Sequence, residues 1–371
     1  MNKRKLFSLL LIIVPMAAVI LIAFSNQELS DAVSALRSMD IRWLACIFLC
    51  WFLYVFFDST GIWLYLRGQG FSLSLGRSLL SNFIGLYYSN ITPGSAGGQP
   101  MQINSLRKAG IPVAYGTMAI TIRFISNQFM VCFLSLALFL INRDFVYRQL
   151  GDAIWFVRLG WVINFAALPL VLLAAFKKSW ILKILTGLLS FLSRIHLLKN
   201  KDAAVSNITE ILDTYHLALQ DLLHHGFQIV VQMLLGALSL TCLMATPIFV
   251  YHALGLSGTP WIHLLTIAFL LFISASYTPL PGASGAQEGG FLLYYQGIFT
   301  GKTIGIALLI WRFFTYYISL LIGVFIQLLE KLLTRRKASR PAPSSSDSNP
   351  ERDQKGSVSH DETSDHRDSQ L

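Results

Sequence analysis

The sequence has little charge for its length of 371 residues. Only 13% of the residues are Asp, Glu, Lys or Arg, whereas 54% are hydrophobic. Apolar runs long enough to cross about 30 Å of hydrocarbon recur along the chain. These runs predict an all-α polytopic membrane protein, and the remaining length leads us to expect no sizeable soluble domain.

The sequence also lacks the patterns of a catalytic, metal or cofactor site. The histidines form no ligand pattern, and no serine lies in the strand-to-helix setting of a nucleophile elbow or a phosphate loop. The cysteines have no metal-ligand spacing and are typical of small buried hydrophobic residues; they are Cys46, Cys50, Cys132 and Cys242. We therefore predict no catalytic residue, no metal and no cofactor.

The basic residues gather in a subset of the loops. The net charge is +10, from 29 basic and 19 acidic residues. Cytoplasmic loops of membrane proteins are rich in Lys and Arg, so we predict that the basic loops of this chain lie in the cytoplasm. Their basic residues are those of segment 3–5, Arg67, Arg77, Arg107, Lys108, and those of segments 177–201 and 331–340. Both termini then lie in the cytoplasm. No stretch interleaves aromatic residues with a basic soluble face, so we predict no nucleic-acid partner.

Six apolar runs are long enough to be full membrane spans. They lie near 6–24, 43–65, 113–141, 155–176, 227–253 and 303–330. The first follows a basic start, as a signal peptide would, but no small-residue cleavage site ends it. We therefore expect it to remain as a helix of the mature protein.

One motif occurs twice inside apolar sequence. It reads Pro-Gly-Ser-Ala-Gly-Gly-Gln over 93–99 and Pro-Gly-Ala-Ser-Gly-Ala-Gln over 281–287, so its Pro, first two Gly and Gln recur at a constant offset of 188 residues. Arg123 follows the first Pro by 30 residues, and Arg312 follows the second by 31. Two helix-breaking loops, each followed by an intramembrane arginine, predict two structural repeats facing a central path for a polar substrate.

Basic residues flank the first motif on both sides, which predicts that its segment turns back. Residues 78–106 lie between Arg77 and Arg107, so we expect a re-entrant helical hairpin there and a second over 261–300. The fold prediction is therefore an inverted repeat with two re-entrant helical hairpins, repeat one at 43–141 and repeat two at 227–330. A kinked helix packed by small residues is the alternative.

The remaining segments lie outside the repeats. The apolar face of 177–226, with basic residues around part of it, predicts an interfacial elbow joining the halves. We take 1–337 as one transmembrane domain. The Ser-, Pro- and charge-rich segment 338–371 is predicted to be a disordered cytoplasmic tail.

Four ionisable residues fall in or beside apolar segments, namely Asp58, Arg123, Glu288 and Arg312. Intramembrane charge is costly and indicates function, although a structural ion pair, for example of Glu288 with either arginine, is the alternative. The helix that begins after each turn would also direct the backbone N–H groups of its first residues toward a bound anion. The predicted substrate-binding residues are Pro93, Gly94, Gly97, Gly98, Gln99, Gln102, Arg123, Pro281, Gly282, Gly285, Gln287, Glu288 and Arg312.

Residues 92–102 and 279–289, which contain the two motifs, resemble the lysylphosphatidylglycerol synthase transmembrane-region family. That family includes the membrane half of the multiple peptide resistance factor, and the resemblance covers about residues 5–333. It implies a bacterial inner-membrane protein with a flippase-like domain acting on phospholipids, often aminoacylated phosphatidylglycerol. Many members carry an acid at the position of Gln99, so a proton-coupling role is not expected there.

The resemblance leaves two functions open. The first is translocation of a membrane phospholipid, with the phosphate held by the motif amides and an arginine. The alternative is a membrane component of a phosphatidylglycerol lysyltransferase or another lipid-modifying transferase, with a stand-alone transferase as partner. Full-length relatives add a soluble domain that transfers lysine from lysyl-tRNA; after Arg340 this sequence has only the predicted tail, so we expect no autonomous transferase activity.

Overall fold

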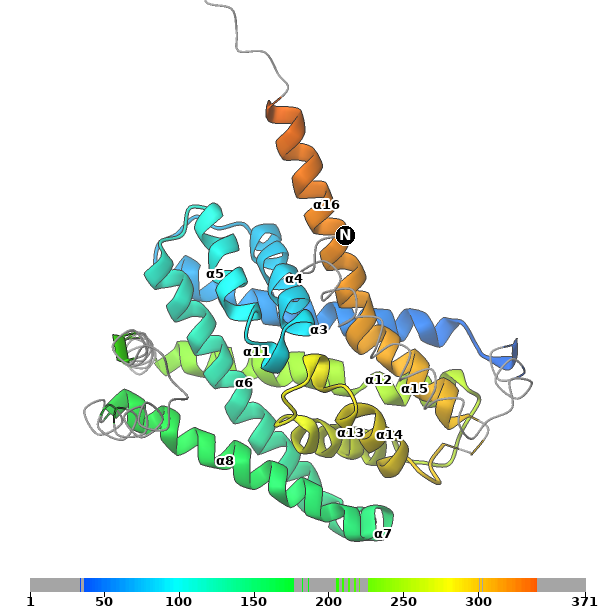
Figure 1. The fold of residues 1–371 in the computed structure, drawn as a ribbon. Coiled ribbons are helices and arrows are strands. Elements are labelled where there is room, and N and C mark those ends of the chain that lie inside the picture. Colours follow the sequence, from blue (N-terminus) through cyan, green and yellow to red (C-terminus); the bar gives the residue numbers. More distant parts are fainter. Residues whose placement is uncertain are drawn as a thin grey trace, which may run out of the picture. The chain divides into compact units, whose positions relative to one another are not determined.

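The computed structural model describes residues 37–176, 226–299 and 303–338, together with a few isolated positions such as Ser34 and Gly301. Every regular element in these ranges is a helix (Figure 1). The predicted first span at 6–24, nearly all of the predicted elbow, Lys302 and the predicted tail beyond residue 338 lie outside the described residues. Residues up to Gln327 belong to one compact unit, which holds both motifs and every residue of the site described below.

Four helical segments are long and apolar enough to cross a membrane. They are α3 (Arg42–Gly68), α6 (Val113–Ile141), α11 with α12 (Gly226–Ala253), and the segment Ile304–Leu329. The third combines α11 (Gly226–Met244) and α12 (Thr246–Ala253). The fourth combines α15 (Ile304–Arg312), the π-helical turn η4 (Phe313–Tyr317) and most of α16 (Ile318–Ala338). These segments confirm an all-α membrane protein and coincide with four of the six predicted spans.

Helix α8 (Ile154–Phe176) coincides with the predicted span 155–176. It follows α7 (Arg143–Leu150) and the short turn η2 (Gly151–Ala153), and it packs against α6 and α13. Gly160 permits this contact, because a Cβ built there would lie only 2.4 Å from the Ile273 carbonyl oxygen. The backbones of α8 and α13 (Trp261–Ala275) are therefore in direct contact.

The first motif forms the turn of a helical hairpin. Helix α4 (Leu75–Ile91) ends before the turn η1 (Pro93–Ser95), and α5 (Gly98–Lys108) returns alongside α4 (Figure 1). Gly98 permits the close approach, because a Cβ there would lie 2.9 Å from the carbonyl oxygen of Gly85 and 1.8 Å from the Ser89 hydroxyl. Any larger residue would separate the two arms.

The second motif also forms the turn of a helical hairpin. Helix α13 leads to the turn η3 (Pro281–Ala283), and α14 (Ala286–Tyr294) packs back against α13. Gly94 has φ 58° and ψ 22°, and Gly282 has φ 59° and ψ 22°. This left-handed conformation favours glycine, which explains why the Pro-Gly pair recurs at both turns.

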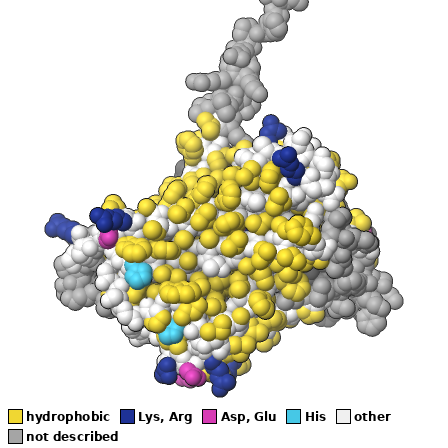
Figure 2. Space-filling view, turned by 180° about the vertical axis from the view of Figure 1, so that it is seen from behind, with side chains coloured by type: hydrophobic (Ala, Val, Ile, Leu, Met, Phe, Trp, Pro, Cys, Tyr) yellow, Lys and Arg dark blue, Asp and Glu magenta, His cyan; other side chains and the backbone are white. Residues whose placement is uncertain are grey.

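Large apolar side chains remain exposed on the outer helices. Phe133, Leu140, Phe227 and Leu321 are each more than half exposed. Figure 2 shows one face on which hydrophobic side chains cover most of the described surface, with Lys and Arg near its margins. An apolar surface of this extent is expected of a protein that contacts lipid.

Candidate functional site

Both motifs line one cavity of about 620 Å³. Of the thirteen predicted site residues, eight line it: Gly94, Gly98, Gln99, Gln102, Arg123, Gly282, Gln287 and Arg312. The lining also includes Asp58, the fourth ionisable residue singled out with the two arginines and Glu288. The other five predicted residues do not line it; they are Pro93, Gly97, Pro281, Gly285 and Glu288.

The two motifs touch each other at their turns. The Gly94 amide donates a hydrogen bond of 2.8 Å to the carbonyl oxygen of Pro279, just before the second motif. The Tyr316 hydroxyl donates one of 2.9 Å to the Asn90 carbonyl oxygen at the end of α4. Segments separated by almost half of the chain therefore meet at the cavity.

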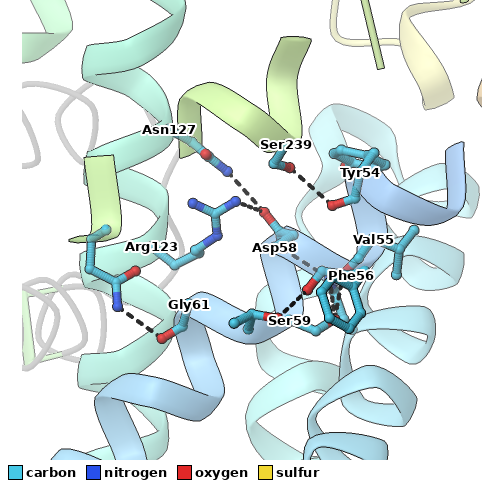
Figure 3. A network of polar contacts seen from close by, with 12 residues as sticks. Tyr54, Val55, Phe56, Asp58, Ser59, Gly61, Arg123, Asn127 and Ser239 are labelled. Atoms are coloured by element: carbon cyan, nitrogen blue, oxygen red, sulfur yellow. Dashed lines mark hydrogen bonds and ion pairs between the residues drawn. The ribbon is translucent and has the colours of Figure 1, made fainter. Parts of the chain in front are cut away.

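Asp58 on α3 and Arg123 on α6 form a buried ion pair (Figure 3). The Arg123 Nη2 group donates to Asp58 Oδ1, to which Asn127 Nδ2 also donates at 3.2 Å. The other carboxylate oxygen, Oδ2, accepts a hydrogen bond of 3.0 Å from Asn82 Nδ2 on α4. Gln102 on α5 extends the network, since its Nε2 lies 3.3 Å from Asn82 Oδ1. The pair thus connects the first hairpin to two full-length helices.

Arg123 is only partly satisfied by this network. Its side chain is 4% exposed, and within the described residues neither its Nε nor its Nη1 has a hydrogen-bond partner. The Asn127 Oδ1 and Gln232 Oε1 atoms are likewise buried without a partner in the part of the chain that the structure describes. Each unmet buried group costs about 1–3 kcal/mol, so this arrangement favours a ligand or a shift that would satisfy them.

Two glycines leave space for the Arg123 side chain. A Cβ at Gly61 on α3 would lie 3.3 Å from Arg123 Cδ and 2.8 Å from Gln232 Oε1. A Cβ at Gly236 on α11 would lie 3.3 Å from Arg123 Nη1. Small residues at these positions let three helices converge around one guanidinium, as is common in membrane helix packing.

The second ion pair joins Glu288 on α14 to Arg312 on α15. Arg312 Nε donates to Glu288 Oε1 at 2.6 Å, and its Nη2 donates to the Gly282 carbonyl oxygen at 3.0 Å. The other Glu288 oxygen accepts a hydrogen bond of 2.6 Å from the Gly285 amide. Because Glu288 is only 2% exposed, this pair holds the second turn from inside the protein.

Several motif amides are already used within the protein. The Gly285 amide binds Glu288, and the Gly97 amide donates to the Thr92 hydroxyl at 2.9 Å. The Gly94 amide binds Pro279 in the opposite turn. In this arrangement the helix N-termini therefore bind the protein's own oxygens, and the arginines are the main cationic groups at the cavity.

Tyr316 is a cavity residue that the sequence analysis did not identify. A Cβ at Gly282 would lie 2.2 Å from the Tyr316 ring, so the ring packs directly on that glycine. The Arg312 guanidinium carbon lies 5.2 Å from the same ring and 5.5 Å from that of Trp311. The spacing of four residues from Arg312, which places Tyr316 near it along the helix, was the available signal.

A polar chain also ends at the cavity, and its members Asn164 and Ser276 were not identified from the sequence. Gln128 Nε2 on α6 donates to Asn164 Oδ1 on α8 at 2.9 Å, and Asn164 Nδ2 donates to the Ser276 hydroxyl at 2.7 Å. All three residues line the cavity. An asparagine in the apolar sequence of α8 was the signal, because such residues need a partner inside a membrane.

The described residues contain no group of three or more His, Cys, Asp or Glu side chains placed to hold a metal ion. The four cysteines are free thiols. The charged chemistry of the cavity therefore rests on Asp58, Arg123 and Arg312 within the described ranges.

Comparison with known proteins identifies the family. The sequence profile of the family described as lysylphosphatidylglycerol synthase TM region matches residues 6–323. No curated protein matches the chain. The matched segment includes both motifs, both ion pairs and every residue that lines the cavity. The chain therefore belongs to the lysylphosphatidylglycerol synthase transmembrane-region family.

Proposed function

We propose that this protein translocates a phospholipid across the bacterial inner membrane. The headgroup, of an aminoacylated phosphatidylglycerol or a similar anionic or modified lipid, passes through the cavity while the acyl chains remain in the bilayer. The observation that carries the proposal is that both motifs and both intramembrane arginines line this one cavity. Cavities of about 300–1,000 Å³ are typical of small-molecule sites, so a volume of about 620 Å³ accommodates a headgroup.

In the proposed arrangement, both hairpins are re-entrant. Their helical arms have 17, 11, 15 and 9 residues, fewer than the roughly 20 that a spanning helix needs. The repeats 43–141 and 227–330 are inverted, and both termini are cytoplasmic. The matched dihedral angles at Gly94 and Gly282 and the contact between the turns support this proposal. Alternating access then follows from rocking of the two halves about the cavity.

We assign the polar lining residues to the headgroup. Arg123 and Arg312 attract its phosphate, since the planar guanidinium of arginine suits phosphate oxygens. Gln99, Gln102 and Gln287 provide amide groups near the turns. The prolines and glycines of the motifs set the shape of the turns, and Glu288 keeps the second turn in place.

A headgroup-resolved flipping assay in proteoliposomes tests the proposal. We expect the wild-type chain to accelerate lipid exchange between leaflets, and we expect Arg123→Ala and Arg312→Ala to abolish it while the protein remains inserted. Arg148→Gln, an exposed change on α7 away from the cavity, is the matched control and should flip lipid normally. Wild-type rates in both arginine variants would exclude this cavity as the path.

The topology can be tested by cysteine-accessibility labelling. Single cysteines at Arg107 and Lys302 should react from opposite sides of the membrane, whereas cysteines at Ser95 and Ala283 should be shielded near its middle. Labelling of 92–99 and 281–287 from bulk solvent on one common face would contradict the inverted arrangement.

The family description favours a second candidate function, because it names a synthase. In that case the cavity presents a lipid acceptor to a stand-alone transferase. Membranes containing the chain should then incorporate radiolabelled lysine into phosphatidylglycerol only when the transferase is added. Incorporation by the purified chain alone would instead show an autonomous enzyme.

A further inference from the structure

We infer that the cavity selects a net-anionic, amine-free phospholipid headgroup, that is, a phosphate carrying uncharged hydroxyl groups, over a cationic aminoacylated one. The inference rests on the proposed lipid site and specifies the chemistry of its cargo. It is drawn from the charges that face the cavity and from which of them are already neutralised.

The side chains that line the cavity include two cations and one anion, and a second anion lies behind them. Among the described residues that line it, Arg123 and Arg312 are cationic, and Asp58 is the one anionic residue. Glu288 neutralises Arg312 from behind but does not line the cavity. The four charges are therefore balanced, so a cationic headgroup finds no unpaired anion here, whereas an anion meets the N–H groups of Arg123 that lack partners among the described residues.

Each oxygen of the two nearby carboxylates already accepts at least one hydrogen bond from the protein. Asp58 Oδ1 accepts from Arg123 and Asn127, and its Oδ2 accepts from Asn82. Glu288 Oε1 accepts from Arg312, and its Oε2 accepts from the Gly285 amide. A lysyl headgroup carries two ammonium groups, and either would have to share a carboxylate oxygen with a donor of the protein.

Aromatic rings can also bind ammonium groups, but the protein's own cation occupies two of the rings at the cavity. The guanidinium carbon of Arg312 lies 5.5 Å from the ring of Trp311 and 5.2 Å from that of Tyr316. An ammonium placed on the same rings would lie close to this guanidinium and be repelled by it.

An anionic headgroup, by contrast, can accept hydrogen bonds from Arg123. Arg123 is 4% exposed and has two N–H groups without partners among the described residues. A phosphate oxygen reaching this guanidinium would satisfy donors that are otherwise buried unmet. Arg123 therefore forms the anion subsite, and Arg312 contributes charge while its Nε and Nη2 groups remain bound to Glu288 and Gly282.

The groups nearer the turns suit hydroxyls. The lining there is made of uncharged amides and hydroxyls, namely Ser89, Asn90, Ser95, Gln99, Thr278 and Gln287. Such groups donate to and accept from a polyol without requiring charge on the ligand. A glycerol headgroup fits this chemistry through its uncharged hydroxyls.

The test compares lipids that differ only in the headgroup. The full chain is reconstituted with trace acyl-labelled phosphatidylglycerol, phosphatidylethanolamine or lysylphosphatidylglycerol. We expect phosphatidylglycerol to be flipped at least tenfold faster than lysylphosphatidylglycerol, with phosphatidylethanolamine between them. Equal or faster flipping of lysylphosphatidylglycerol would overturn the inference and leave the proposed translocation intact.

An added acid should change this preference. Gln99 is exposed and lines the cavity, so Gln99→Glu introduces a carboxylate with little risk to folding. We expect the rate ratio of lysylphosphatidylglycerol to phosphatidylglycerol to rise at least fivefold. Gln296→Glu, an exposed change that does not line the cavity, should leave the ratio unchanged. An unchanged ratio in Gln99→Glu would count against charge selection.

A binding measurement separates the two proposals. Thermal stabilisation of the detergent-purified chain is measured with short-chain phosphatidylglycerol, short-chain lysylphosphatidylglycerol, glycerol 3-phosphate and inorganic phosphate. Stabilisation by phosphatidylglycerol above all others, without flipping of any lipid, would sink the translocase proposal and support the headgroup inference. Equal stabilisation by glycerol 3-phosphate would show that a soluble phosphate compound is the ligand and would overturn the inference.

Discussion

The two hairpins share a motif and the backbone conformation of its Pro-Gly turn, but the arginines that follow them are held differently. Arg312 binds an acid and a carbonyl oxygen of the hairpin that precedes it, namely Glu288 and that of Gly282. Arg123 binds Asp58 on the full-length helix α3 and keeps two buried N–H groups without partners in the described residues. A repeated sequence has therefore produced one arginine that stabilises a turn and one that remains available to a ligand.

A single position explains much of this difference. Glu288 directly follows the Gln of the second motif, and the corresponding position after the first motif is Pro100. The first hairpin thus has no acid where the second has its internal partner. Arg123 instead reaches across to a neighbouring helix, where its partner Asp58 also faces the cavity.

The largest expected effect comes from removing the arginine that stabilises a turn. Arg312→Met leaves Glu288 buried without its cation, and breaking a buried pair from one side costs about 3–5 kcal/mol. We expect a loss of stability of this size in denaturant titrations in mixed micelles. Arg123→Met should reduce the free energy of unfolding by less, because Asp58 keeps hydrogen bonds from Asn82 and Asn127.

The double variant Arg312→Met, Glu288→Gln is the control for that prediction. Removing the unpaired charge should recover a large part of the lost stability. Equal stability of the two single arginine variants would remove the distinction between the two pairs.

The matched glycines give the next comparison. Gly94→Ala and Gly282→Ala place a side chain at the same positive φ, which costs each about 1–3 kcal/mol. Only at Gly282 would the new methyl group meet a ring, that of Tyr316, whereas nothing lies within 4 Å at Gly94. Overpacking against this ring should destabilise the Gly282 variant alone by about 1–3 kcal/mol more. Thermal unfolding of both variants measures the difference, and Tyr316→Ala should reduce it.

The third comparison concerns transport. Arg123→Gln removes a charged donor from the proposed anion subsite, and hydrogen bonds to charged groups contribute about 1.5–3 kcal/mol. We expect phosphatidylglycerol flipping to fall roughly ten- to hundredfold while the protein still inserts and purifies normally. Full recovery by Arg123→Lys would indicate that charge alone suffices, whereas partial recovery would favour the planar guanidinium.

The smallest effect is expected at the contact between the turns. Tyr316→Phe removes the hydrogen bond to the Asn90 carbonyl oxygen but keeps the ring on Gly282. The free energy of unfolding should fall by about 1 kcal/mol, as for a typical single hydrogen bond. Thermal unfolding measures it, and Tyr115→Phe, at a tyrosine that does not line the cavity, is the matched control. A loss as large as that of Gly282→Ala would mean that the hydroxyl, and not the ring, holds the two turns together.

Much of the fold could be predicted from the sequence. Four spans agree with the helical segments within a few residues, because long apolar runs and Pro-Gly breaks act locally. The cavity could be predicted only in part. Eight of the thirteen predicted residues line it, but Tyr316 and Asn164 were missed because their partners lie on other helices.

The sequence by itself determined the membrane class, the positions of the spans and the two turn motifs, since each depends on residues within one helix or one loop. It left open which arginine pairs with Glu288. Only the tertiary structure decided that Arg312 does so and that Arg123 pairs with Asp58, 65 residues away. The physical reason is that ion pairing depends on which helix faces pack together, and this packing is a property of the assembled protein.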